Sequence, residues 1–132
     1  MTEEESEGQE GQAEQHLPPQ VILVGEAGFE PKFPVVGTEI EYYWSEINVG
    51  GKHTEDVYHA RVVFKNDDEV IDDLSVECTP LATNETAYRT TKLSAPRERG
   101  ISYSIELWVD IDHNEQSTTA NYAYHSVTVD DA

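Results

Sequence analysis

The residues that come closest to a known chemical pattern are the carboxylates and amides between positions 110 and 121. Asp110, Asp112 and Asn114 recur at every second position and Glu115 follows them, as oxygen ligands do at the start of Ca²⁺-binding loops. An EF-hand is excluded, because the sixth position is Glu115 instead of glycine and the twelfth is Asn121 instead of glutamate. Two interpretations stay open. Asp110, Asp112, Asn114 and Glu115 could form a looser Ca²⁺ site, or the Asp and Asn side chains could hydrogen-bond the backbone of their own loop.

Two aromatic residues are candidates for contact with a partner. Trp108 lies on the opposite parity from the apolar residues before it, and Tyr43 opposes its neighbours Tyr42 and Trp44 in the same way. Exposed Trp and Tyr side chains are common in contact surfaces, so these residues predict a patch for a protein or a carbohydrate partner. The alternative is that a loop covers each ring at the rim of a sheet.

Other chemical signatures are missing from the sequence, which contains no nucleophile elbow, phosphate-binding loop, HExxH or CxxC pair. No two of the five histidines lie at ligand spacing within one predicted element, so we expect none to bind zinc, and His59 and His125 are predicted to face solvent. Cys78 alternates with Leu74 and Val76, which indicates a core position. We therefore expect no catalytic residues, no enzyme activity and, apart from Ca²⁺, no cofactor.

Alternation of apolar and polar residues marks the strands that must position these loops. Seven such segments are separated by turn residues, which predicts an all-β, antiparallel sandwich of about seven strands. The clearest segment begins at Ile101, the first of five predicted inward positions. In two segments the apolar positions change sides, so we expect one β-bulge near Ser45-Glu46 and another between Tyr124 and Val127. The predicted strands cover residues 20–24, 39–49, 57–64, 70–78, 86–93, 101–109 and 122–129.

Charge divides the chain into two parts and limits its partners. Residues 1–16 hold six glutamates and no Lys or Arg, so we expect residues 1–19 to form a disordered acidic tail and residues 20–130 to form one domain. The net charge is −19, and without the six tail glutamates 21 acidic residues still face 8 basic ones. This excess predicts no direct nucleic-acid binding and no attraction to anionic membranes, and it favours a cationic partner or Ca²⁺.

The sequence shows neither a signal peptide nor an apolar run of about 18 residues, so we expect no membrane insertion. If the chain is an excerpt of an exported protein, a cell-surface location follows. Otherwise an intracellular or virion location is expected.

Short motifs also follow one another in a distinctive order along residues 20–129. They are Val21–Val24, Pro34–Thr38, Asn48–Gly50, Val57–Phe64, Leu81 to Asn84, Ala95-Pro96, Val109-Asp110, Asn114-Glu115, Asn121, Val127 and Val129. In this order they resemble the CARDB family, the cell-adhesion-related domain of bacterial and archaeal proteins. The chain departs from the family pattern at Asn84, where glycine is usual, at Tyr122, where a second asparagine is usual, and at Glu46, where an apolar residue is expected.

The resemblance implies an immunoglobulin-like, seven-stranded sandwich with a noncatalytic, adhesive or scaffolding role, and it supplies no catalytic residues. Two alternatives remain. The chain could be an accessory or decoration protein of a virion, in which immunoglobulin-like domains are frequent. It could also be an acidic inhibitor that mimics nucleic acid, which requires carboxylates arrayed on one face at phosphate-like spacing.

Overall fold

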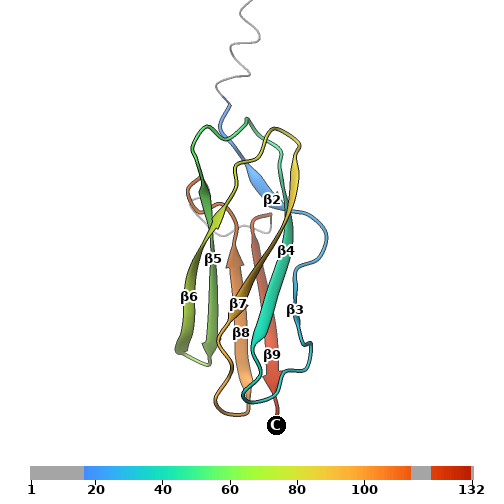
Figure 1. The fold of residues 1–132 in the computed structure, drawn as a ribbon, viewed down its shortest axis with the longest axis vertical. Helices are drawn as coiled ribbons and strands as arrows, with labels where there is room; N and C mark the ends of the chain where they lie inside the picture. Colours follow the sequence, from blue (N-terminus) through green and yellow to red (C-terminus); the bar gives the residue numbers. More distant parts are fainter. Residues whose placement is uncertain (1–16, 114–119, 132) are drawn as a thin grey trace, which may run out of the picture.

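The computed structural model describes residues 17–113 and 120–131, and all regular structure in these residues is β (Figure 1). This range holds no helix that is long and apolar enough to cross a membrane. Of the predicted disordered tail, residues 1–19, all but residues 17–19 lie outside the described residues, as do the predicted ligands Asn114 and Glu115. Pro18 is described, and its carbonyl accepts from the N–H of Gly51 at 2.9 Å. The strands are β2 (Val21–Leu23), β3 (Gly28–Glu30), β4 (Ile40–Asn48), β5 (Tyr58–Asn66), β6 (Glu69–Cys78), β7 (Thr86–Leu93), β8 (Gly100–Trp108) and β9 (Tyr122–Val129).

The strands form two antiparallel sheets, which confirms the predicted immunoglobulin-like sandwich. In the first sheet, β4 pairs with β7 along one side and with the short strands β2 and β3 along the other. The second sheet has the order β6-β5-β8-β9. The described strands number eight because β3, in the proline-rich stretch before β4, pairs with β4 residues 41–43.

The core lies between the sheets and is built from the inward residues of β4, β5 and β8. In β5, Tyr58, Ala60, Val62 and Phe64 are all fully buried, as their alternation predicts. Cys78 is buried as well, and the burial raises the pKa of its thiol to about 12. A thiol with so high a pKa is inert as a nucleophile at neutral pH.

The bulge predicted near Ser45-Glu46 is wrong. β4 alternates between inward and outward residues over its whole length, and its register with β7 is unbroken. The inward side therefore continues through Glu46 and Asn48, both of which are fully buried. These polar residues are accommodated because each makes several hydrogen bonds, and Glu46 accepts from Trp44 Nε1, the Tyr58 hydroxyl and Arg89.

Two expectations for the closing hairpin are also corrected. Ile101 is 82% exposed, because the register of β8 with β9 shifts between Gly100 and Tyr103. The register between the two strands is continuous from Tyr103 to Trp108 of β8, which pair with residues 122–127 of β9. The bulge predicted in β9 is therefore wrong. His125 consequently points inward, where its Nε2 lies 2.9 Å from the Tyr42 hydroxyl and where burial lowers the pKa of the imidazole.

Candidate metal centre

Two histidines and one carboxylate meet at one end of the sandwich. His53 comes from the connection between β4 and β5, and Asp110 and His113 come from the connection that follows β8. One ligand atom from each residue lies within 4.8 Å of the others. The side chains of His53 and Asp110 are 0% exposed and that of His113 is 22% exposed, so the cluster is closed on one side and open on the other.

Buried Asn48 holds the connection that carries His53. Its Nδ2 donates to the carbonyls of Gly51 (2.8 Å) and Leu81 (3.1 Å), and its Oδ1 accepts from the backbone N–H groups of Gln20 and Gly50. The residue therefore ties the chain after β4 to the segment after β6. This tie places the backbone of Leu81 beside His53, whose own N–H donates to the Leu81 carbonyl at 3.2 Å.

The second connection is shaped by a backbone turn at Asp110. Asp110 has a φ of 49°, in the left-handed region that Asp and Asn tolerate better than most residues. The N–H of Ile111 then donates to the carbonyl of His59 at 2.8 Å, and the N–H of His113 closes the turn on the Asp110 carbonyl at 3.2 Å. The turn is thereby fastened to the start of β5, next to His53.

Within the cluster, the Asp110 carboxylate lies between the two imidazoles. Its Oδ2 is 3.2 Å from Nε2 of His53, and its Oδ1 is 2.7 Å from Nδ1 of His113. The second nitrogen of each ring also faces a polar group. Nδ1 of His53 lies at the backbone of Leu81, and Nε2 of His113 lies 3.0 Å from Oε2 of Glu55.

An aromatic contact fixes the plane of the His53 ring. The ring stacks on Tyr58 with centroids 4.2 Å apart and an interplanar angle of 1°. Because the ring is buried, stacked and held at both nitrogens, its orientation does not depend on solvent. A site of this kind, with two imidazole nitrogens and a carboxylate on fixed loops, has the donor set and rigidity to hold a divalent metal ion.

The predicted Ca²⁺ ligands do not all belong to this cluster. Asp110 does, but Oδ2 of Asp112 accepts from the backbone N–H of His59 at 2.8 Å and lies 3.0 Å from its Nδ1. Neither histidine was predicted, since none was expected to bind zinc. His53 lies 57 positions before Asp110, and only the topology brings the two loops together. The one local signal was the D-x-x-H spacing of Asp110 and His113, which places both side chains on one turn.

The structure does not bring Trp108 and Tyr43 together in one patch. Trp108 lies on the outer face of β8, where it packs on Tyr122 (centroids 5.3 Å apart) and under Arg61 (5.2 Å). Tyr43 lies on the outer face of β4, in the other sheet, with its ring 6.2 Å from that of Tyr88. The two residues therefore belong to separate surfaces.

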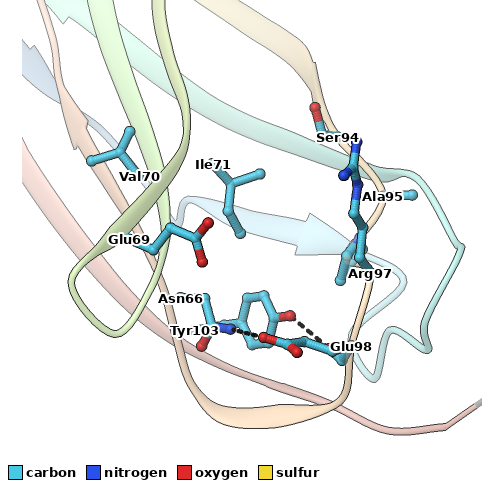
Figure 2. A pocket seen from close by; sticks show the side chains of 10 residues that line it. Asn66, Glu69, Val70, Ile71, Ser94, Ala95, Arg97, Glu98 and Tyr103 are labelled. Carbon is cyan, nitrogen blue, oxygen red and sulfur yellow. Dashed lines mark hydrogen bonds between the residues drawn. The ribbon is translucent and has the colours of Figure 1, made fainter.

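A cavity of about 420 Å³ lies far from the histidine cluster, between the end of the β5–β6 hairpin and the chain after β7 (Figure 2). Figure 2 shows Tyr103 at its base, with Asn66 and Glu98 beside it, and the Tyr103 hydroxyl donates to the Glu98 carbonyl at 2.6 Å. The nine-residue strand β5 separates this end from the cluster, a distance of about 26 Å at the usual rise per residue.

Solved structures resemble this one over most of its length. The CARDB domain of the PF1109 protein from Pyrococcus furiosus, crystallised in complex with di-metal ions, is 21% identical, with a TM-score of 0.55 over 86% of this chain and 96% of that one. The sporulation control protein Spo0M from Bacillus subtilis is 15% identical, with a TM-score of 0.53 over 83% and 51%. A β-glucosidase from Listeria innocua is 10% identical, with a TM-score of 0.54 over 87% of this chain and 16% of the enzyme.

No family model matches the sequence, and no curated protein sequence matches it. The likeness to solved structures is therefore one of fold. It agrees with the ordered motifs of the sequence, and it covers almost the whole of the PF1109 domain. The chain has a CARDB-like fold.

Proposed function

We propose that the chain is a noncatalytic interaction module, adhesive or scaffolding in role, which holds a divalent metal ion between His53, Asp110 and His113 and binds a protein or carbohydrate partner. The observation that carries the proposal is the convergence of three ligand atoms within 4.8 Å at the loop end of a CARDB-like sandwich. The di-metal complex of the PF1109 CARDB domain supports it, because it gives a precedent for metal in this fold.

The distance between the histidine cluster and the cavity supports a noncatalytic role. Enzyme sites usually combine titratable groups with the main cavity of the protein. Here the cavity at Tyr103 and the cluster at Asp110 lie at opposite ends of β5. The buried thiol of Cys78, with its pKa raised to about 12, is also unsuited to nucleophilic chemistry.

A metal ion at this position would fix the two loops of this end of the sandwich relative to each other. His53 and Asp110 belong to different connections, so an ion bound by both would crosslink them. Loops fixed before binding lose less conformational entropy when a partner docks. The ion would therefore prepare a contact surface without taking part in a reaction.

Metal binding is tested by calorimetric unfolding of the untagged full chain after treatment with EDTA. A divalent ion at 100 times its Kd stabilises the native state by about 2.7 kcal/mol, which raises the Tm by roughly 10 °C for a domain of this size. We expect this rise in the wild type and in His59→Gln, where the altered histidine lies outside the cluster. His113→Gln should lose it, and an unchanged Tm of the wild type with all divalent ions would contradict metal binding.

The partner is tested with the labelled full chain, with metal and with EDTA. Carbohydrate recognition predicts signals on a glycan array that EDTA removes. Protein recognition predicts a blank array and metal-dependent adhesion to cells, which protease treatment of the cells abolishes. Binding in neither assay would contradict the interaction role.

A further inference from the structure

We infer that the site takes a transition-metal ion such as Zn²⁺ in preference to Ca²⁺, with Nε2 of His53, Nδ1 of His113 and the Asp110 carboxylate as ligands. The inference rests on the proposed function, and it deepens that function by naming the class of ion and the ligating atoms. It further assigns the ring proton of metal-bound His53 to Nδ1, where it is donated to the Leu81 carbonyl.

The kinds of ligand atom in the cluster favour a transition-metal ion over Ca²⁺. Ca²⁺ takes six to eight oxygen ligands, whereas Zn²⁺ and its neighbours bind imidazole nitrogen well and form four-coordinate sites. Two of the three ligand atoms here are imidazole nitrogens. The nearby carboxylate of Asp112, which a Ca²⁺ site would need, is occupied by the backbone N–H and ring of His59.

The distances between the ligand atoms are close to those around a tetrahedral zinc ion. Ligand atoms about 2.0–2.1 Å from a tetrahedral zinc ion lie about 3.3–3.4 Å from each other. Nε2 of His53 is 3.2 Å from Oδ2 of Asp110, which already matches this separation. Nδ1 of His113 is 2.7 Å from the other carboxylate oxygen, Oδ1, so an ion shared by this nitrogen and Oδ1 requires an outward shift of about 0.6 Å. His113 can make that shift because its side chain is 22% exposed.

The ring protons of His113 carry the third step. Nδ1 is hydrogen-bonded to Oδ1 of Asp110 and Nε2 lies 3.0 Å from Oε2 of Glu55, so a carboxylate oxygen lies close to each nitrogen. An ion on Nδ1 leaves one proton on Nε2, directed at Glu55, and this is the usual arrangement of a metal-bound histidine with a carboxylate behind it.

Glu55 fits that arrangement in a second respect. Its Oε2 is a buried atom that accepts no hydrogen bond from the described residues, although Nε2 of His113 is only 3.0 Å away. The pair is close in distance but not aligned as a hydrogen bond. A rotation of the His113 ring is needed to align the N–H with this oxygen.

The surroundings of His53 carry the last step. Leu81 presents both its N–H (3.1 Å) and its carbonyl oxygen (3.2 Å) to Nδ1 of the ring. Without metal, Nδ1 accepts from the N–H while the Nε2 proton is donated to Asp110. With metal on Nε2, the proton moves to Nδ1 and is donated to the carbonyl. The ring therefore has a backbone partner in both states. With metal bound, the Leu81 N–H gives up its acceptor, and the Leu81 carbonyl, which already accepts from the His53 N–H and from Asn48 Nδ2, receives a third donor.

The test is the protonation state of each ring nitrogen in the untagged, ¹⁵N-labelled full chain, read from long-range ¹H–¹⁵N correlations. One sample is treated with EDTA, one receives equimolar Zn²⁺ and one receives Ca²⁺. We expect the proton of His53 to move from Nε2 to Nδ1 with Zn²⁺ and to stay on Nε2 with Ca²⁺. The ring signals of His59 and His125 should not move, and they serve as internal controls.

The outcomes separate the inference from the proposed function. If Ca²⁺ binds and Zn²⁺ leaves both rings of the cluster unchanged, the inference is overturned and metal binding stands. If neither ion perturbs the loop end, both fail. A Glu55→Gln variant, altered at a side chain that is 32% exposed, should fold normally and lose about 10–100-fold in zinc affinity. Unchanged zinc affinity in this variant would contradict the role given to Glu55.

Discussion

Two buried carboxylates, those of Glu46 and Asp110, are both 0% exposed and have different partners. Glu46 accepts hydrogen bonds from Trp44 Nε1 (2.7 Å) and from the Tyr58 hydroxyl, and Arg89 Nε lies 3.3 Å away. Its charge is matched by a guanidinium that stays protonated at every physiological pH. Asp110 instead faces two imidazoles, which are metal ligands when neutral.

The difference separates a structural network from a candidate binding site. A carboxylate paired with a permanent cation is held in one state, and its neighbours are fixed with it. Where a carboxylate lies between two imidazoles, a metal ion can take the place of a proton on each ring nitrogen and bind the carboxylate as well. Tyr58 joins the two regions, because its hydroxyl donates a hydrogen bond to Glu46 and its ring stacks on His53. Burial and the neighbouring Glu46 carboxylate hold the pKa of this hydroxyl well above its usual range.

The largest expected effect is on the structural side of this comparison. Arg89→Met leaves the buried carboxylate of Glu46 without its cation, so we expect the free energy of unfolding to fall by about 3–5 kcal/mol. Urea denaturation of the EDTA-treated chain measures the change. A companion Glu46→Gln, Arg89→Met variant should recover part of the loss, and a loss below about 1 kcal/mol in the single variant would show that the pair is not a stabilising unit.

A change at the other carboxylate should act mainly through metal. Asp110→Asn keeps a residue that tolerates the φ of 49° and removes the ligand charge. We expect the roughly 2.7 kcal/mol of stabilisation by saturating Zn²⁺ to disappear, with a smaller change in the metal-free chain. Urea denaturation with and without Zn²⁺ measures both quantities, and full retention of the zinc effect would exclude Asp110 as a ligand.

Tyr58→Phe tests whether the two regions are separable. The variant loses hydrogen bonds to Glu46 and Arg89 but keeps the ring that stacks on His53. The free energy of unfolding should fall by about 1–3 kcal/mol, and the zinc affinity should stay within about twofold of wild type. Denaturation and zinc titration calorimetry measure the two effects, and a large drop in zinc affinity would mean that the hydroxyl network also supports the cluster.

The smallest effect concerns His125, a histidine that packs against rings. It contacts Tyr42 and Phe29, and burial lowers its pKa below 6.5. The unfolded chain therefore binds the proton more readily, so this residue costs stability as the pH falls below 6.5, by up to about 1.4 kcal/mol per pH unit. His125→Phe should flatten this part of the stability profile between pH 7.5 and 5.5, and a profile identical to wild type would contradict the burial effect.

The sequence predicted the strands well, because alternation reflects burial on one face of a sheet. The predicted span of 86–93 coincides with β7, and the order of the motifs predicted the fold. The same rule predicted a bulge near Glu46 that does not exist, because the rule treats every glutamate as an outward residue. Glu46 points inward, where hydrogen bonds from Trp44, Tyr58 and Arg89 satisfy its carboxylate. Of the three residues in the candidate metal centre, the sequence pointed only to Asp110. The histidines were not expected to bind zinc, and the position of His53 depends on two loops that meet only in the folded chain.

The central claim is that His53, Asp110 and His113 together hold a transition-metal ion. Anomalous diffraction at the zinc absorption edge, from crystals of the untagged chain grown with equimolar Zn²⁺, tests it most directly. We expect a peak within about 2.0–2.2 Å of His53 Nε2, His113 Nδ1 and a carboxylate oxygen of Asp110. A peak at His59 and Asp112 instead, or no peak at the cluster while zinc occupies other positions, would contradict it.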